Sequence, residues 1–356
     1  MRRFLIISIA LVMVAACRQP VTPARDTIAL VKDIAAGTYA QGREVVVAAA
    51  RPSSSGEIFI AGSPEYSERL VAEFLECDIV YNTRGSAWSD GLKDFAGETF
   101  SCICDGTFSP YGSIHSSDSL RELAVRLAIA ALDTKCNVSV YDLDANATKA
   151  QAKVLILSDP WLLEYGKFDI DTLFAMTSCR VPVISPQELM LDAVFTGEHK
   201  AFNVGIICDS AFVGTGIYPR IFNSGANGHS IVGARCFEGA GSLYDFLDSY
   251  IAAGHTEPLD AILVDDLSLD QSDLESQLSA IRDFSLEESM LYGKYVSPRL
   301  EIINSGLLTM RKCYDILRGK DLFTHKIAMP LSRYYDVQRR PWSEDMQFLL
   351  IPRKDV

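Results

Sequence analysis

From residue 44 onward, short apolar runs rich in Val and Ile alternate with longer amphipathic stretches. Continuous apolar runs of this length are typical of strands that are buried on both faces of a sheet. The expected strands are 45–49, 58–61, 78–81, 100–104, 138–141, 154–157, 181–184, 204–208, 231–236, 261–264 and 300–303, with two short ones near the end at 326–330 and 346–352.

The stretches between these runs have helical patterns. Pro64 suits the first turn of a helix, and Ser117 or Asp118 can cap a helix whose leucines recur at helical spacing. The expected helices are 64–76, 117–133, 169–178, 186–196, 242–253, 268–284 and 305–318. Strand–helix alternation at this spacing predicts βαβ units, and therefore an α/β protein with doubly wound, mostly parallel sheets.

The number of expected strands is enough for two lobes. A polar break at 197–200 precedes a fresh strand, so we expect an N-terminal α/β lobe over 43–199 and a C-terminal α/β lobe over 200–356. The last segments can cross back and complete the first sheet, which would make the chain pass between the lobes more than once.

The first seventeen residues, MRRFLIISIALVMVAAC, have the order of a secretory signal. Arg2 and Arg3 precede an apolar run that is too short for a stable membrane span. The ending from Val14 to Cys17 resembles the lipobox of bacterial lipoproteins. This resemblance implies a signal peptide at 1–16 and a lipid on Cys17. We expect residues 17–42 to form a tether that becomes a short helix, because Pro20 and Pro23 keep its first part extended. The alternative is an ordinary signal cut after Ala16, with Cys17 as a free thiol.

The net charge of the chain limits the classes of partner that it can bind. The formal net charge is -13, and loss of Arg2 and Arg3 with the signal would take it to about -15. A surface this acidic repels phosphate backbones, so we expect no nucleic-acid partner. It gives no basic patch for an anionic bilayer, so attachment to a membrane of the bacterial envelope, outside the cytoplasm, would depend on the lipid.

Eight further cysteines are Cys77, Cys102, Cys104, Cys136, Cys179, Cys208, Cys236 and Cys313. Most lie in apolar, strand-like runs, where cysteine behaves as a small buried hydrophobe. We therefore expect mostly free thiols, with one or two disulfides as the alternative. Cys102 and Cys104 should not bond to each other, because so small a ring would distort a strand.

Polar residues follow several expected strands, at the sheet edge where ligands bind in doubly wound folds. The two tryptophans among them could stack on a ligand. The candidate ligand-binding residues are Trp88, Asp90, Asp105, Asp159, Trp161, Asp209, Ser210 and Asp265. The alternative is structural, since Asp and Ser cap helices and form turns after any strand.

Common catalytic motifs are absent from the sequence. It has no phosphate-binding Gly-x-x-x-x-Gly-Lys, no His-Glu-x-x-His and no Gly-x-Ser-x-Gly. The five histidines are scattered singly, and the sequence contains no Cys-x-x-Cys motif of the kind that binds a metal ion. We therefore expect no cofactor, no metal and no catalytic residue, which favours binding over catalysis but leaves an enzyme open.

An exported chain with two parallel α/β lobes resembles the type I periplasmic solute-binding proteins. Residues 203–212, NVGIICDSAF, are similar to the strand that opens a lobe in that family, and residues 259–266, LDAILVDD, to a strand that ends at its cleft. The resemblance implies a lipid-anchored protein that holds a small polar solute between its lobes and has a transport partner. A neutral or cationic ligand such as a sugar, nucleoside or amine would suit an acidic cleft. The alternatives are an exported enzyme of a doubly wound fold and an envelope protein-interaction module.

Overall fold

The computed structural model describes residues 25–78, 80, 91–195, 203–223, 235–326, 328–341 and 347–353. The proposed signal peptide, Cys17, Trp88 and Asp90 lie outside these residues. In the part that is described, no helix is long and apolar enough to cross a membrane.

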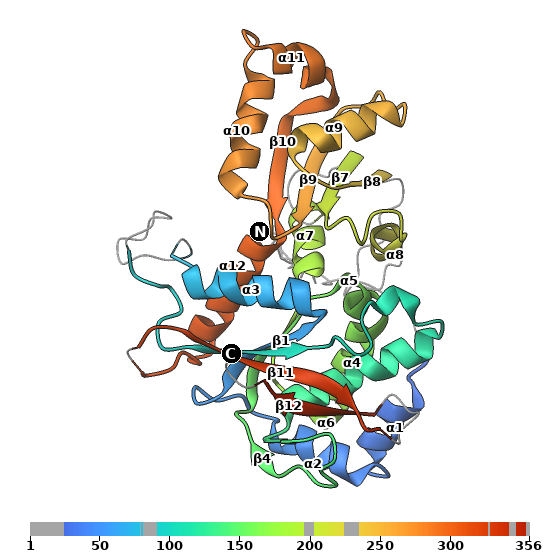
Figure 1. Cartoon of the computed structure of the whole chain (residues 1–356), viewed down its shortest axis with the longest axis vertical. Helices are drawn as coiled ribbons and strands as arrows, with labels where there is room; N and C mark the ends of the chain where they lie inside the picture. The colour runs from blue at the N-terminus through green and yellow to red at the C-terminus, as the bar shows by residue number, and fades with distance from the viewer. Residues whose placement is uncertain are drawn as a thin grey trace, which may run out of the picture.

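A six-stranded sheet forms the first lobe, in the lower half of Figure 1. Its strand order is β12-β11-β2-β1-β5-β6, and every neighbouring pair is parallel except β11 with β12. Every residue of β1 and β5 is buried, as the continuous apolar runs predicted. The strands are β1 (Glu57–Gly62), β2 (Thr99–Cys104), β5 (Ala152–Leu157), β6 (Val183–Ile184), β11 (Leu331–Arg339) and β12 (Phe348–Pro352).

A four-stranded parallel sheet forms the second lobe, in the upper half of Figure 1. Its order is β10-β9-β7-β8, with bounds β7 (Asn203–Cys208), β8 (Arg235–Gly239), β9 (Leu259–Asp265) and β10 (Val296–Asn304). The prediction of an α/β protein with mostly parallel sheets is confirmed. A small antiparallel pair, β3 (Lys135–Cys136) with β4 (Ala147–Thr148), adds to the first lobe.

Helices cover both faces of the first sheet because side chains alternate along each strand. Phe59 belongs to the core shared with α1 (Ala29–Ala36), α2 (Ala40–Ala48), α4 (Ser117–Leu132) and α6 (Phe168–Thr177). Ile58 and Ile60 belong to the core on the opposite face, under α3 (Pro64–Glu76) and α12 (Ser305–Gly319). Between β5 and α6 lie a short helix α5 (Pro160–Leu162) and a π-helical turn η2 (Leu163–Lys167).

Helix α7 (Pro186–Phe195) leads from the first lobe toward the second, and its apolar residues share a core with β7 and α8 (Ile217–Asn223). The other core of the second lobe lies under α9 (Leu243–Ala252) and α10 (Gln271–Arg282). Ser242 and Asp245 form a capping box that begins α9. Helix α11 (Glu287–Tyr292) and the turn η3 (Gly293–Tyr295) lead into β10 at the far end of the lobe, at the top of Figure 1.

After the second sheet the chain returns to the first. Asn304 ends β10 and caps α12, which packs beside α3, and β11 then pairs with β2. The return is held by a buried ion pair of 2.5 Å between Lys153 and Glu98. Lys153 also donates to the Leu322 carbonyl at 2.8 Å, and Glu98 accepts from the Thr324 amide at 2.8 Å. Helix α12, β11 and β12 therefore belong structurally with the 43–199 segment.

Several expected strands differ from the structure. Residues 326 and 328–330 form no strand and directly precede β11, and the expected strands 78–81 and 231–236 lie partly outside the described residues. Residues 45–49 lie mostly in helix α2, where Val46 is buried but Val47 is half exposed. Residues 138–141 form an exposed loop, with Tyr141 72% exposed. In both cases the Val-rich composition suited a strand, but no neighbouring strand pairs with it, and propensity alone does not decide the structure.

The eight cysteines from Cys77 to Cys313 form no disulfide within the described part of the chain. Seven of them are buried and Cys236 is partly buried. The Cys102 and Cys104 sulfurs are 3.2 Å apart on one face of β2, a contact rather than a bond.

Candidate functional site

A pocket of about 690 Å³ lies between the two lobes. It is lined by residues that follow β1, β2 and β5 of the first sheet and β7 and β9 of the second. Its volume is in the range of sites for small organic molecules. The carboxyl ends of both sheets therefore face one shared cavity, where ligands bind in parallel α/β folds.

Asp159 is the buried carboxyl group that follows β5, with only 2% of its surface exposed. It caps helix α5, accepting from the Trp161 amide at 2.9 Å. Burial raises the pKa of Asp159 to about 7, although hydrogen bonds from the Trp161 amide and the Ser63 side chain oppose the rise. Asp265 and Asp105 raise this pKa further by charge repulsion.

Asp105, which follows β2, is fully buried and orders the loop beyond that strand. It accepts from the amides of Thr107 and Phe108 at 3.2 and 3.0 Å and from the Tyr111 hydroxyl at 3.1 Å. Burial raises its pKa to about 6. Tyr111 lines the pocket whereas Asp105 lies behind it, so Asp105 acts on the pocket by holding Tyr111.

Asp265 ends β9 and joins the two lobes. Its carboxylate, fully buried, accepts from the Tyr66 hydroxyl of α3 at 2.5 Å and the Tyr218 hydroxyl of α8 at 2.6 Å. Gln187 of α7 donates to it at 2.9 Å, and Tyr66 also contacts the Ser305 hydroxyl at 3.0 Å. Burial raises the pKa of Asp265 despite these three donors.

The remaining wall combines aromatic rings with rim charges. The Trp161 ring stacks on Tyr165, with ring centroids 5.9 Å apart, and Phe212 contributes a ring from the segment after β7. Arg69 of α3 lies 3.8 Å from Asp266, across the boundary between the lobes. The pocket therefore offers flat apolar faces and an excess of carboxyl groups.

Of the eight expected ligand residues, the structure describes six. Asp159, Trp161, Asp209 and Asp265 line the pocket, and Asp105 lies behind it. Ser210 is exposed, donates to the neighbouring Asp209 carboxylate at 3.5 Å, and is not among the residues that line the pocket. Trp88 and Asp90 are outside the described residues.

Several lining residues were not singled out from the sequence, among them Arg69, Tyr111 and Phe212. Arg69 lies within α3, more than one turn from the strand end, and Tyr111 lies six residues beyond Asp105. The rule that polar residues just after a strand reach the cleft does not extend to these positions. A Pro-Tyr-Gly sequence in a long loop was the available signal for Tyr111.

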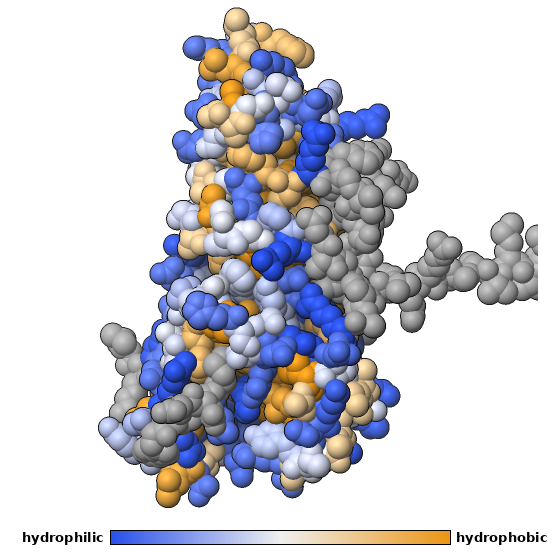
Figure 2. Space-filling model, turned by 90° about the vertical axis from the view of Figure 1, so that its right-hand side faces the viewer, coloured by the Kyte–Doolittle hydropathy of each residue, from blue (hydrophilic) through white to orange (hydrophobic). Residues whose placement is uncertain are grey.

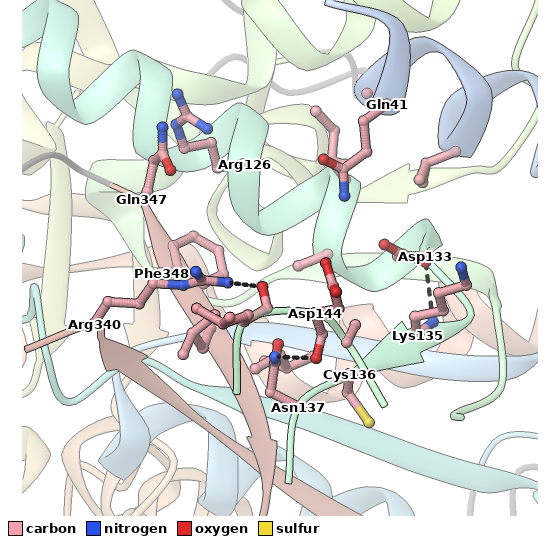
Figure 3. A pocket seen from close by; sticks show the side chains of 18 of the residues that line it. Gln41, Arg126, Asp133, Lys135, Cys136, Asn137, Asp144, Arg340, Gln347 and Phe348 are labelled. Atoms are coloured by element: carbon pink, nitrogen blue, oxygen red, sulfur yellow. Dashed lines mark hydrogen bonds between the residues drawn. The ribbon is translucent and has the colours of Figure 1, made fainter. Parts of the chain in front are cut away.

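A second hollow of about 340 Å³ lies in the first lobe and is lined from α2, α4, β3 and β12 (Figure 3). Several of its polar groups already have protein partners. Arg126 pairs with Glu122 at 2.5 Å, Arg340 donates to the Leu143 carbonyl at 2.8 Å, and Asn137 donates to the Asp144 carbonyl at 3.2 Å. The last two contacts hold the 137–146 loop, which favours a structural role for this hollow.

Among the residues that the structure describes, no group of three His, Cys, Asp or Glu side chains could hold a metal ion. Among the carboxyl groups that line the pocket, those of Asp159, Asp209 and Asp265 accept hydrogen bonds from amide or hydroxyl groups.

No protein-family model and no curated protein sequence matches the chain. Among solved structures, glutamate racemase from Thermus thermophilus, in complex with Beta-chloro-D-alanine, has a TM-score of 0.45 at 13% identity, covering 81% of this chain and 90% of the racemase. Glutamate racemase isoform RacE1 from Bacillus anthracis has a TM-score of 0.44 at 13% identity, covering 79% and 88%. Glutamate racemase from Francisella tularensis subsp. tularensis SCHU S4, in complex with D-glutamate, has a TM-score of 0.42 at 12% identity. The match covers 80% of this chain and 88% of the racemase. This similarity assigns no activity to the chain.

Proposed function

We propose that the pocket between the lobes binds a small polar organic molecule and that the chain is a solute-binding protein of the periplasmic type. The observation that carries the proposal is the meeting of five strand ends from two sheets at one cavity of about 690 Å³. Its wall holds both aromatic faces and buried carboxyl groups, which together orient a small polar ligand.

The test is a thermal-shift screen of the purified chain against pooled metabolites. A ligand that binds the folded state raises the melting temperature by mass action. Asp209→Ala and Trp161→Leu should each weaken the binding of a hit about tenfold, because each removes one contact at the wall. Asp144→Ala, in the second hollow, should leave the binding unchanged. Hits that respond equally to all three variants would place the site elsewhere.

A second candidate is an enzyme that transfers a proton to or from its bound substrate. Asp159 supports it, because a buried carboxyl group with a pKa of about 7 exchanges protons readily at neutral pH. Product analysis of each hit after incubation separates the two candidates. Turnover that Asp159→Asn abolishes would establish the enzyme, whereas an unchanged ligand supports the binding protein.

We also propose that a lipid on Cys17 anchors the chain to a membrane of the bacterial envelope. The support is the sequence from Arg2 to Cys17, with its basic start, apolar run and Val-Ala-Ala-Cys ending. Cys17→Ser should leave an uncleaved or soluble form in fractionated cells. Mass spectrometry that finds an unmodified Cys17 in the membrane fraction would contradict the proposal.

A further inference from the structure

We infer that the ligand of the pocket between the lobes is an organic ammonium ion, bound against Asp159 and the ring of Trp161. The inference rests on the proposed binding function and narrows its ligand class. It is based on the acidic side chains of the pocket wall and on the aromatic rings beside them. The described part of the chain also holds no group of three side chains that could bind a metal ion.

The described wall of the pocket has an excess of acidic over basic side chains. One cationic side chain, Arg69, lies among the lining residues, and it is within 3.8 Å of Asp266. The acidic side chains that line the same cavity are Glu65, Asp159, Asp209, Asp265 and Asp266. An anionic ligand would meet repulsion here, whereas a cation would gain attraction that the partly enclosed site screens less than open water does.

Aromatic rings determine what kind of cation fits. The rings of Trp161 and Phe212 line the cavity, together with Tyr66 and Tyr111. Aromatic faces attract the ammonium group and also contact its methyl or methylene groups. A hydrated metal ion would gain nothing from these faces, and the described residues hold no three-ligand group for one. A sugar would use the rings but leave the excess of carboxyl groups without a counter-charge.

Asp159 couples this binding to a proton. Because the pKa of Asp159 is about 7, this carboxyl group is protonated and neutral in a large share of the ligand-free molecules at neutral pH. A cation beside it favours the ionised form, so binding should release a proton and strengthen as the pH rises. The groups that face Asp159 or act on its charge are Ser63 and Tyr66 from the start of α3, Asp105 and Tyr111 after β2, and Asp265 at the end of β9.

These neighbours differ in whether they can titrate together with Asp159. Tyr66 and Tyr111 have pKa values raised well above the normal value by burial, so they stay neutral over the useful range. Burial raises the pKa of Asp105 only to about 6, and Asp105 lies behind Tyr111. Asp265 has three protein donors and faces the lobe boundary. Asp159→Asn removes the titrating group of Asp159 alone, so the part of the pH dependence that this variant abolishes belongs to Asp159.

The experiment is isothermal titration calorimetry on the full chain in detergent, with two cations and their neutral carbon analogues. Choline is compared with the alcohol in which a quaternary carbon replaces its nitrogen, and ethanolamine is compared with propanol. At least one cation should bind about tenfold or more tightly than its analogue. Choline keeps its charge at every pH, so any pH dependence of its affinity comes from the protein.

If Asp159 must be ionised, choline affinity should rise roughly tenfold between about pH 6 and pH 8, with a proton released to the buffer. Asp159→Asn should weaken choline binding and remove this dependence, while Asp144→Asn in the second hollow should change neither. Equal binding of a cation and its neutral analogue, or no binding of either cation at millimolar concentration, would overturn the inference. A neutral metabolite hit that Trp161→Leu weakens would then leave the proposed binding function standing, whereas no hit from any pool would remove both.

Discussion

The main chain itself carries the residues just after the strand ends to the cavity between the lobes. Asp159 and Asp265 lie directly beyond or at the end of β5 and β9, and both line the pocket. Arg69 and Phe212 reach it from a helix interior and a loop, so their positions depend on how the two lobes pack. A local sequence pattern does not contain that information.

At this scale the buried carboxyl group of Asp159 predicts a pH dependence of stability. Its folded pKa of about 7 exceeds the unfolded value, so the folded state binds the extra proton and is favoured at low pH. The contribution of Asp159 to the free energy of unfolding is fully present below about pH 4 and is lost as the pH rises through about 7. The loss is at most about 1.4 kcal/mol per pH unit. Asp159→Asn should flatten the change in urea-unfolding free energy across this window. Asp209→Asn at the rim is the control, and an unaltered slope in Asp159→Asn would contradict the assignment.

Elements that are buried on both faces were predictable because their composition leaves few alternatives. Strands β1, β2, β5, β7 and β9 follow the apolar runs closely. Strand β11 was not predicted, because charged residues such as Arg333 and Asp336 interrupt its run, and it is held by pairing with β2 and β12. Its place in the first sheet depends on contacts distant in sequence.

The buried ion pair behind this return should be costly to break. Glu98→Gln leaves the Lys153 ammonium, which is fully buried, without its counter-charge, and should lower the unfolding free energy by about 3–5 kcal/mol. The matched control is Glu76→Gln, which removes an exposed carboxylate 2.7 Å from Lys93 and should cost about 0–1 kcal/mol. Urea unfolding measures both. Equal small losses would show that the pair does not hold the returning chain.

Across the whole molecule, the ends of both sheets meet at a boundary that one carboxylate bridges. Figure 2 shows apolar side chains in orange at the far end of the second lobe. Met290 of α11 is 84% exposed, and Phe284, between α10 and α11, is 95% exposed. This exposed tip is remote from the boundary, beyond α10 in Figure 1. The joining of the lobes relies on the buried hydrogen bonds around Asp265, on the packing of α7 and α12, and on the apolar contacts of α5 and η2 with α8.

Removing the bridging hydroxyl should loosen the lobes without unfolding either one. Tyr66→Phe deletes the 2.5 Å hydrogen bond from the first lobe to Asp265, whereas Tyr218→Phe deletes a 2.6 Å bond within the second lobe. Each loses one hydrogen bond to the same buried carboxylate, so each should lower stability by about 1–3 kcal/mol. Gln187 still donates to Asp265 in both variants. Only Tyr66→Phe should enlarge the radius of gyration in solution scattering and broaden the calorimetric unfolding transition, because only it weakens the connection between the lobes. Indistinguishable scattering and calorimetry for the two variants would mean that Tyr66 contributes stability but does not control how the lobes are held together.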